Sequence, residues 1–384
     1  MSGQTISQRK KHWVYRIMTT KKNILRAIWV PIWVLLLASC SKDDVLEPVE
    51  DIVRQAEVTY LVSPNGLGDN GYNDAAAEGI FAFAGQTGTR LRLLLPSDEA
   101  EAEAMYRQWL TENAARDSVV LVMGSEAYGA LVAQTPLGLT GRGTRVLLFE
   151  SGLTDLPDGA SAFIINRYGA AYLCGAMSGM LSALVFAAAP GYATLNDAIS
   201  GFMDGYEAHH AEGKKAELIY LADGETGFAM PDSAYHVLSR RMEDFFFYNE
   251  MVFPLLGGSG VGVLRCMNDY ESNLGLIIGM DVDQSSMSPR VPFSMVIRTG
   301  DVLHNYLDDW LAGHDWPKSR TIGMSEGGTA VMLHPSFYER EVLTLGSYDD
   351  PNTFQGLYDR YKEEAMEKES LTPSPSPKGE GSNY

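Results

Sequence analysis

Short apolar runs alternate with stretches of helical composition from residue 57 to about residue 365 of this 384-residue chain. Near-continuous apolar strands separated by helices indicate parallel sheets covered on both faces. The runs fall into two sets of four: Val58–Val62, Leu91–Leu95, Val119–Met123 and Val146–Phe149, then Leu184–Ala188, Leu218–Leu221, Met251–Leu256 and Leu276–Met280. The segment between the sets, Phe163–Gly169, leads into a predicted helix rich in small residues, Ala170–Ser182. The chain is therefore predicted to be an α/β protein with two Rossmann-like lobes, parallel sheets and a ligand cleft between the lobes.

A glycine-rich loop, Gly66–Asp74, follows the first predicted strand. In open α/β sheets, small ligands bind at loops that follow the carboxyl ends of strands. The G-x-G-x-x-G spacing of the loop matches a dinucleotide fingerprint, but the carboxylates of Asp69 and Asp74 would repel a pyrophosphate. Asp69, Tyr72 and Asn73 instead suit a neutral ligand with a flat ring and hydroxyls, because rings stack and carboxylates accept from hydroxyls.

A second glycine-rich loop follows a strand of the second predicted lobe. The seventh apolar run leads into Gly257–Gly260, and glycines at a strand end let backbone amides approach a ligand closely. We expect Gly257 and Gly258 to line the cleft; a tight turn without a ligand role is the alternative. The eighth run ends near Asp281 and Asp283, and because side chains alternate along an extended chain, at most one of them faces the cleft.

The amino-terminal 39 residues have the features of a targeting segment. They contain seven Lys and Arg residues and no acid, and the apolar run Ala27–Ala38 follows these basic residues. A membrane-spanning helix needs about 20 apolar residues, so residues 1–39 are predicted to be a signal peptide. Met18 is a candidate translation start, because a signal of ordinary length begins there. Leu37–Cys40 resembles a bacterial lipobox, so we expect Cys40 to be lipidated; an ordinary cysteine in an uncleaved anchor is the alternative.

Residues 40–56 are expected to form a lipidated tether. The run Ser41–Asp44 resembles the surface-export signal of some Gram-negative lipoproteins, and a solvated tether is an equal alternative. The protein is thus predicted to be in the cell envelope, facing the periplasm or displayed on the outer surface. All 49 acids of the chain, whose net charge is −19, follow residue 39. Such a surface repels nucleic acid and anionic lipid, so membrane attachment would come from the lipid on Cys40.

Cysteine and histidine usage predicts neither a disulfide framework nor a metal site. After the lipobox only Cys174 and Cys266 remain, both in apolar surroundings, and we expect buried free thiols rather than a disulfide. His209 and His210 are adjacent and therefore point to different helix faces. No metal and no cofactor are expected. Residues 366–384 include a Pro/Ser/Gly-rich stretch and are predicted to be a disordered tail.

Five segments, in order along the chain, resemble the basic membrane protein family of substrate-binding lipoproteins, which includes the purine nucleoside receptor lipoproteins. They are Gly66–Asn73, Gly169–Gly175, Gly257–Gly262, Gly279–Gln284 and Ser325–Val331. The resemblance implies a type I periplasmic binding protein fold whose lobes are joined by several crossings. Lobe 1 would then comprise residues 57–162 and about 290–322, and lobe 2 residues 163–289 and about 323–365.

The resemblance also implies roles for individual residues. Tyr72, where the family usually has Phe, and Phe253 would sandwich a nucleobase. Asp281 would hold the ribose together with Arg298, which stands where the family has lysine. That difference could change the hydroxyl geometry, because a guanidinium is a planar fork and an ammonium a mobile point charge. From its position after the third predicted strand, and not from the resemblance, Glu126 is expected to read an edge of the base; a solvated loop acid is an equal alternative.

The predicted function is that of the ligand-binding lipoprotein of an ABC-type importer. It would act as a monomer that captures a small neutral polar ligand by lobe closure and delivers it to a permease, with a purine nucleoside as the favoured ligand. Two other classes stay open: a ligand sensor without transport, and a nucleoside or glycoside hydrolase that uses Asp69 and Asp281 as paired carboxylates.

Overall fold

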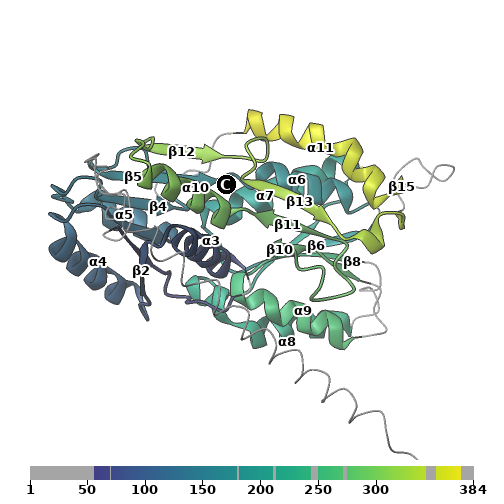
Figure 1. Cartoon of the computed structure of the whole chain (residues 1–384). Helices are drawn as coiled ribbons and strands as arrows, with labels where there is room; N and C mark the ends of the chain where they lie inside the picture. The colour runs from purple at the N-terminus through teal and green to yellow at the C-terminus, as the bar shows by residue number, and fades with distance from the viewer. Residues whose placement is uncertain are drawn as a thin grey trace, which may run out of the picture. The chain divides into compact units, whose positions relative to one another are not determined.

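The structure, a computed structural model, describes residues 56–69, 71–179, 181–210, 213–243, 250–270, 275–342 and 352–372 (Figure 1). All of these residues lie in one compact unit, Glu50–Tyr384. The predicted signal peptide, the lipidation site Cys40 and the tether up to residue 55 lie outside the described residues. No helix within the described ranges is long and apolar enough to cross a membrane.

Lobe 1 is built on a six-stranded parallel sheet with the strand order β12-β5-β4-β3-β1-β2. The strands are β1 (Glu57–Leu61), β2 (Arg90–Leu94), β3 (Val119–Gly124), β4 (Arg145–Phe149), β5 (Ala160–Ile165) and β12 (Ser319–Ile322). The helices are α3 (Tyr72–Thr87), α4 (Glu99–Asn113), α5 (Glu126–Gln134) and α10 (Thr299–Leu311).

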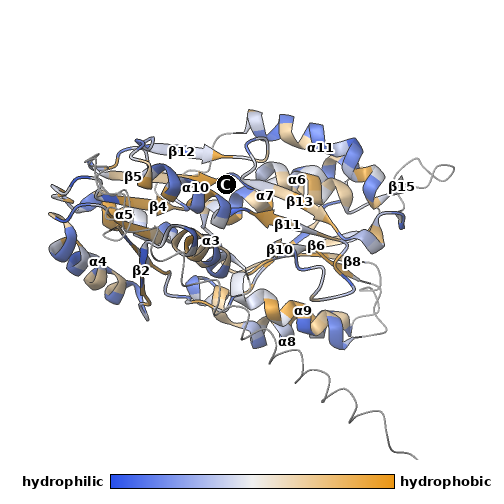
Figure 2. Ribbon diagram, viewed as in Figure 1, coloured by the Kyte–Doolittle hydropathy of each residue, from blue (hydrophilic) through white to orange (hydrophobic). Residues whose placement is uncertain are grey.

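Helices cover both faces of this sheet because successive strand residues point to opposite sides. In β3, Val120 and Val122 belong to the core that includes α3 and α10, whereas Leu121 and Met123 belong to the core formed with α4 and α5. Figure 2 shows the result, with hydrophobic strands inside and hydrophilic outer faces on the helices. The four predicted strands of lobe 1 are confirmed.

Lobe 2 has two hydrogen-bonded sheets, β7-β6-β8-β9 and β10-β11-β13. The strands are β6 (Ser182–Ala187), β7 (Glu217–Tyr220), β8 (Glu250–Leu255), β9 (Leu276–Ile277), β10 (Gly279–Asp281), β11 (Phe293–Ile297) and β13 (Thr329–Leu333). Between β9 and β10, the backbone N–H of Ile278 donates to Val252 (N···O 2.9 Å), so the two sheets are joined at this strand. Of these strands, all pair in parallel except β13, which runs antiparallel to β11.

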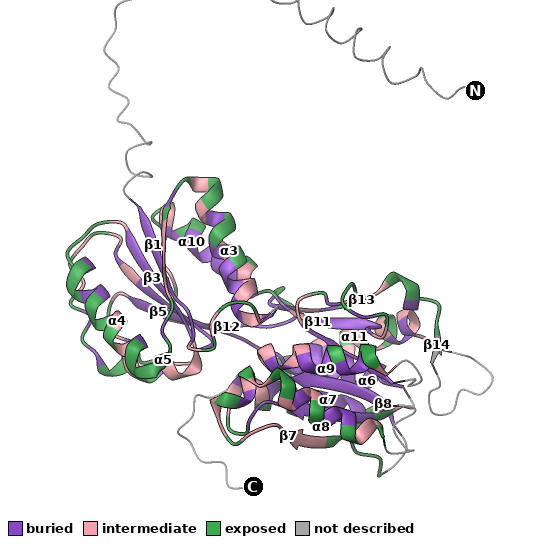
Figure 3. Ribbon diagram, turned by 90° about the horizontal axis from the view of Figure 1, so that it is seen from below, coloured by how far each residue is buried: buried purple, intermediate pink, exposed green. Residues whose placement is uncertain are grey.

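The helices of lobe 2 also lie on both sides of its strands (Figure 3). They are α6 (Tyr168–Met177), α7 (Ala193–His209), α8 (Pro231–Met242), α9 (Gly260–Asp269) and α11 (Phe354–Leu371), with short 3-10 helices η1 (Glu225–Ala229), η3 (Gly257–Ser259) and η4 (Pro335–Phe337) and the short strand pair β14 (Glu341–Val342) and β15 (Asn352–Thr353). The predicted small-residue helix is α6, which packs closely on α7. A Cβ on Gly201 or Gly205 of α7 would collide with the carbonyl oxygens of Tyr168 or Tyr172.

The described chain passes between the lobes at three places: after β5, after β11 and after β12. The second crossing was expected near residue 290 but lies at Arg298, because β11 pairs with both β10 and β13 of lobe 2. The segment Phe163–Ile165 was expected to be part of a link, yet it belongs to β5, whose six residues are all buried.

The carboxyl-terminal helix α11 extends beyond the predicted start of the disordered tail. Residues 366–371 are helical, and Glu369 within them is buried. Its carboxylate accepts hydrogen bonds from the backbone N–H groups of Gly169 (3.3 Å) and Met324 (2.7 Å), at two of the crossings. The tail prediction is therefore wrong for residues 366–371, because these contacts fix the last helical turns; residues 373–384 lie outside the described residues.

Candidate functional site

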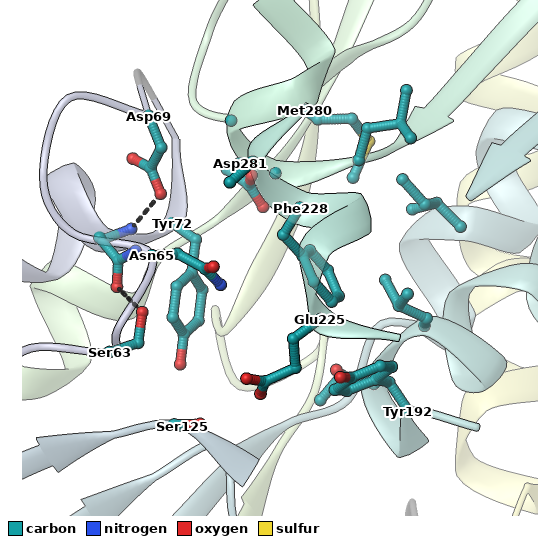
Figure 4. Close-up of a pocket in the computed structure, with 18 of the residues that line it drawn as sticks. Ser63, Asn65, Asp69, Tyr72, Ser125, Tyr192, Glu225, Phe228, Met280 and Asp281 are labelled. Carbon is teal, nitrogen blue, oxygen red and sulfur yellow. Dashed lines mark hydrogen bonds between the residues drawn. The ribbon is translucent and has the colours of Figure 1, made fainter. Parts of the chain in front are cut away.

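A cavity of about 330 Å³ lies between lobe 1 and lobe 2 (Figure 4). It is located at the carboxyl ends of β1, β3 and β4 from one lobe and of β8 and β10 from the other. Lobe 1 contributes Ser63, Asn65, Leu67, Gly68, Asp69, Tyr72, Asn73, Gly124, Ser125, Glu126 and Glu150; Arg167 comes from the first crossing; lobe 2 contributes Tyr192, Thr194, Leu195, Glu225, Phe228, Ala229, Pro231, Pro254, Leu255, Leu256, Gly257, Gly258, Met280 and Asp281.

The first glycine-rich loop forms one wall of the cavity, but two of its polar side chains are used by the loop itself. The carboxylate of Asp69 accepts from the backbone N–H groups of Gly71 (3.0 Å), Asn73 (2.9 Å) and Asp74 (3.2 Å) and so caps the start of α3. The amide oxygen of Asn73 accepts from the Ser63 hydroxyl at 3.1 Å. Asp69 and Asn73 therefore border the cavity while their oxygens hold the loop in shape.

Tyr72 presents its ring to the cavity from the first turn of α3. The ring packs on Phe149, with 5.7 Å between the ring centroids. Burial raises the pKa of the Tyr72 hydroxyl well above its ordinary value, and the charge of Glu150 raises it further. The hydroxyl therefore stays protonated and can donate a hydrogen bond as well as accept one.

The second aromatic wall consists of Phe228 and Tyr192, which the sequence interpretation did not include. Phe228 lies in η1, the 3-10 helix after β7, and contacts Tyr192 edge to face with 5.0 Å between centroids. Figure 4 shows Tyr72 and Phe228 on opposite sides of the cavity. The available signal was the position of Phe228 in the loop after a parallel strand, where ligand sites of open sheets lie.

Phe253, the predicted partner of Tyr72, does not line the cavity. It is fully buried in β8 and stacks on Phe202 of α7, with 4.7 Å between centroids. Its side chain lies in the core between β8 and α7, because successive side chains of a strand point to opposite faces. The following residues, Pro254 and Leu255, reach the cavity instead. The structure thus contradicts the prediction that Phe253 contacts the ligand.

The second glycine-rich loop borders the cavity at Gly257 and Gly258. Gly257 has a φ of +51°, a left-handed conformation that favours glycine. A Cβ on Gly258 would lie 3.5 Å from the Cβ of Asp69. The two glycine-rich loops, one from each lobe, therefore lie against each other at this edge of the cavity.

Glu126 joins the lobes. Its carboxylate, at the start of α5 in lobe 1, accepts from Ala193 N–H (3.1 Å), Thr194 N–H (3.0 Å) and the Thr194 hydroxyl (2.7 Å) at the start of α7 in lobe 2. A carboxylate is favourable there because unpaired N–H groups and the helix dipole give a helix N-terminus a partial positive charge. In this arrangement Glu126 is neither a solvated acid nor free to read a base edge.

Glu150, Arg167 and Asp281 form one charged part of the cavity wall. Glu150 follows β4, and its Oε2 lies 2.6 Å from Nη1 of Arg167. Both side chains are buried, with exposed fractions of 3% and 7%. Burial raises the pKa of the Glu150 carboxyl above its ordinary value, although Arg167 opposes the shift. The pair therefore forms a buried salt bridge.

Asp281 ends β10 on the lobe 2 side. Burial raises the pKa of its carboxyl to about 7; Arg167 lowers it, and Asp69 and Glu150 raise it further. A Cβ on Gly71 would lie 2.7 Å from Asp281 Oδ2, so the first loop and Asp281 are neighbours across the cleft. Asp283, two residues later, is exposed and does not line the cavity.

Arg298, the predicted cation of the site, lies elsewhere. It is exposed and borders a shallow surface hollow with Asp301, His304 and Glu326. It stands at the crossing that leads from β11 into α10 and is not among the residues that line the cavity. The cation at the cavity is Arg167, so the structure contradicts the prediction for Arg298.

The described residues contain no group of three or more His, Cys, Asp and Glu side chains placed to hold a metal ion. Cys174 and Cys266 are buried free thiols, and burial raises the thiol pKa of Cys266 to about 12.

Known proteins match this chain in fold rather than in sequence. No family of known sequences and no curated protein matches it. An ABC transporter solute-binding protein from Aeropyrum pernix K1 superposes with a TM-score of 0.61 at 16% identity, covering 82% of this chain and 86% of that one. A transcriptional activator of the comK gene from Bacillus halodurans gives 0.57 at 14% identity, covering 82% and 97%. A solute-binding protein from Conexibacter woesei DSM 14684 gives 0.53 at 15% identity, covering 83% and 99%.

The chain has a type I periplasmic binding protein fold. Parallel strands of the two lobes point their carboxyl ends toward the same cavity, which lies where the lobes meet. At identities of 16% and below, the similarity concerns the fold alone.

Proposed function

We propose that this protein is the ligand-binding component of an ABC-type importer and that it captures a small neutral polar ligand, foremost a purine nucleoside, by closing its two lobes. The observation that carries the proposal is the cavity itself, whose walls come from both lobes. Its volume of about 330 Å³ falls in the range of small-molecule sites. A ligand that contacts both walls would stabilise the closed arrangement.

The chemistry of the walls supports a ligand with a flat ring and hydroxyl groups. Tyr72 and Phe228 offer ring faces from opposite sides, at which a nucleobase could stack. Asp281 offers a carboxyl group for hydroxyls at the lobe 2 edge. Phe228 would thus take the place expected for Phe253, and Arg167 the place expected for Arg298. The resemblance to the nucleoside-binding lipoproteins supports the same ligand class.

The alternatives are less well supported. Hydrolysis by Asp69 and Asp281 would need a free carboxylate at Asp69, whose oxygens already accept three backbone hydrogen bonds. A sensor without transport would bind ligand through the same cavity but would not associate with a permease. Copurification of the protein with membrane permease subunits in the presence of ligand distinguishes an importer component from a sensor.

A thermal-shift screen of the chain from Ser41 onward tests the ligand class. The panel contains adenosine, guanosine, inosine, the free bases, ribose and other pentoses. We expect a nucleoside to raise the melting temperature of the wild type most, and Tyr72→Ala to lose that shift. Tyr220→Ala, an exposed tyrosine on β7 outside the cavity, is the control. A shift with pentoses and none with nucleosides would replace the proposed ligand by a sugar.

Membrane attachment through a lipid on Cys40 belongs to the same proposal. Metabolic labelling with palmitate should mark the wild-type chain and not Cys40→Ser, and the labelled chain should sediment with membranes. Equal labelling of the two chains would refute the lipid site.

A further inference from the structure

Two acids of the cavity hold backbone conformations that side chains rarely adopt. Within the described ranges, the non-glycine residues with positive φ are Ser118, Glu150 and Asp281, with values of 55°, 60° and 65°. Ser118 precedes β3 and lies away from the cavity, whereas Glu150 and Asp281 stand at strand ends that border it. Such conformations cost about 1–3 kcal/mol each and cluster at functional sites. The two strained acids therefore point to a role that ordinary folding does not explain.

Glu150 keeps one acceptor without a partner. Its Oε2 pairs with Arg167, but Oε1 is buried and no described residue donates a hydrogen bond to it. An unsatisfied buried acceptor costs roughly 1–3 kcal/mol. Because Glu150 lines the cavity, a ligand bound there is a candidate donor for this oxygen.

Arg167 is held in a fixed orientation beside that oxygen. Its backbone N–H donates to Asp197 (2.5 Å), and Nη1 donates to Glu150 (2.6 Å) and to the carbonyl of Ile165 (3.3 Å). A guanidinium has five N–H donors, so Nη2 and Nε keep donors of their own. The wall at this point therefore offers an acceptor and a donor side by side.

We propose that Glu150 determines ligand specificity: its Oε1 accepts a hydrogen bond from a hydroxyl group of the ligand, while Arg167 donates to the same group. A hydroxyl both donates and accepts, whereas an ammonium group has no acceptor for Arg167. An anionic group would be repelled by Glu150 and Asp281. The ligand class is therefore a polyol, and this rests on the proposed function, in which the polyol is the ribose of a nucleoside.

The other two acids of lobe 1 that line the cavity, Asp69 and Glu126, do not offer the same interaction. The oxygens of Asp69 and Glu126 already accept backbone hydrogen bonds at helix starts. Among the acids of lobe 1 that line the cavity, Glu150 is thus distinguished by a buried oxygen to which no described residue donates.

A thermodynamic cycle that combines protein variants with ligand analogues tests the role of Glu150 in ligand specificity. The purified full chain, in detergent, is titrated calorimetrically with guanosine, adenosine and inosine and with their 2′-deoxy, 3′-deoxy and 5′-deoxy analogues. The variants are the wild type, Glu150→Gln and the control Glu78→Gln, an exposed site on α3. In Glu150→Gln the amide oxygen must face Arg167, so its NH₂ group faces the ligand and presents a donor where the hydroxyl needs an acceptor.

We expect Glu150→Gln to weaken the parent nucleoside roughly 10- to 100-fold. One deoxy analogue should bind the wild type more weakly than the parent nucleoside does, by a similar factor. The affinity of that analogue should fall little further in Glu150→Gln, because it lacks the hydroxyl that Glu150 would bind. Glu78→Gln should match the wild type throughout. Equal losses for the parent and for all deoxy analogues, or no loss, would overturn the role of Glu150.

Two further results are informative: a Glu150→Gln variant that does not fold, and a wild type that does not bind the ligands. If Glu150→Gln does not fold, the wild-type data decide: no loss of affinity with any deoxy analogue overturns the proposal. If the wild type binds no nucleoside and no pentose, the proposed function fails, and the role of Glu150 fails with it. Binding without selective loss at one hydroxyl overturns only the role of Glu150.

Discussion

Five acids border the cavity, and four of them divide into two pairs by what surrounds their oxygens. The helix-capping acids, Asp69 and Glu126, accept hydrogen bonds from backbone amides at the starts of α3 and α7. The strand-end acids, Glu150 and Asp281, stand at positive φ, and burial raises the pKa of both. The oxygens of the first pair are occupied by amides at helix starts, whereas the backbone of the second pair is strained.

The difference shows that an acid in a ligand cavity indicates a ligand contact only when the hydrogen-bond partners of its oxygens are known. The helix-capping acids build the walls: Asp69 shapes the first loop, and Glu126 ties lobe 1 to lobe 2. The strand-end acids lie beside Arg167 and keep hydrogen-bonding capacity for a ligand. We therefore expect variants of the helix-capping acids to lower mainly stability and variants of the strand-end acids to lower mainly ligand affinity. A variant that breaks the buried salt bridge between Glu150 and Arg167 is the exception, because it should also lower stability.

The largest effect is expected from Glu150→Ala. This change leaves Arg167 buried without its carboxylate, and breaking such a pair typically costs 3–5 kcal/mol. Urea unfolding of the ligand-free protein should show a loss of about 3 kcal/mol or more, whereas Glu78→Ala should unfold like the wild type. An unchanged unfolding midpoint would mean that the pair of Glu150 and Arg167 contributes nothing to the free energy of unfolding. Glu150 would then not belong with the strand-end acids as described.

The second effect concerns binding. Asp281→Asn replaces a carboxyl acceptor at the lobe 2 edge by an amide. Above pH 7, where this carboxyl is ionised, the affinity for the nucleoside should fall by about 1.5–3 kcal/mol, or more than tenfold. Asp283→Asn, on the exposed residue two positions later, serves as the matched control in calorimetry. If the two variants bind equally well, Asp281 does not contact the ligand.

Asp69→Ala should act on stability. The variant leaves three amides at the start of α3 without their acceptor, and loss of such a cap costs about 1–2 kcal/mol. Asp69→Asn keeps an acceptor and should recover part of the loss in the same urea titration. A variant with unchanged stability and strongly reduced affinity would move Asp69 into the ligand-contacting pair.

The ligand-free protein should also respond to pH through Asp281. Its folded-state pKa of about 7 exceeds the ordinary value near 4, so between these values the folded state binds a proton that the unfolded state has lost. Stability from this group is therefore greatest below about pH 4 and decreases as pH rises through about 7. Asp281→Asn should flatten the fall in melting temperature across this window, and an unchanged slope would contradict the assignment.

The smallest effect is expected from Glu126→Gln. The amide oxygen can still accept from Thr194, but the charge that interacts with the start of α7 is lost, at a cost of roughly 0.3–1 kcal/mol. Because the contact joins the lobes, ligand affinity should fall a few-fold, and small-angle scattering should report a slightly larger average radius. Compaction and affinity equal to those of the wild type would show that the contact does not favour closure.

The strands of the parallel sheets could be predicted because burial on both faces makes them near-continuous apolar runs. All eight predicted runs are strands, with Leu276–Met280 divided into β9 and β10. Strand β12 escaped prediction because Ser319–Ile322 is an edge strand with two polar residues and an arginine. The helical end of α11 escaped because Glu369 is fixed by contacts with distant residues, which composition does not reveal.

The candidate site was predictable where a loop and its strand determine the position. The two glycine-rich loops, Tyr72 and Asp281 all border the cavity. The predictions for Phe253 and Arg298 were wrong for two reasons. The face to which Phe253 points depends on how its strand pairs in the sheet. The place where the chain crosses between the lobes, at Arg298, depends on the pairing of β11. Glu150 and Arg167 come together from the end of one strand and the start of a helix, a contact that no local pattern contains.

A crystal structure of the protein with the nucleoside that stabilises it most tests the central claim directly. We expect the base between Tyr72 and Phe228, and a ribose hydroxyl within hydrogen-bond distance of Glu150 Oε1 and of Arg167. A nucleoside bound outside this cavity, or one whose hydroxyls contact neither Glu150 nor Asp281, would contradict it.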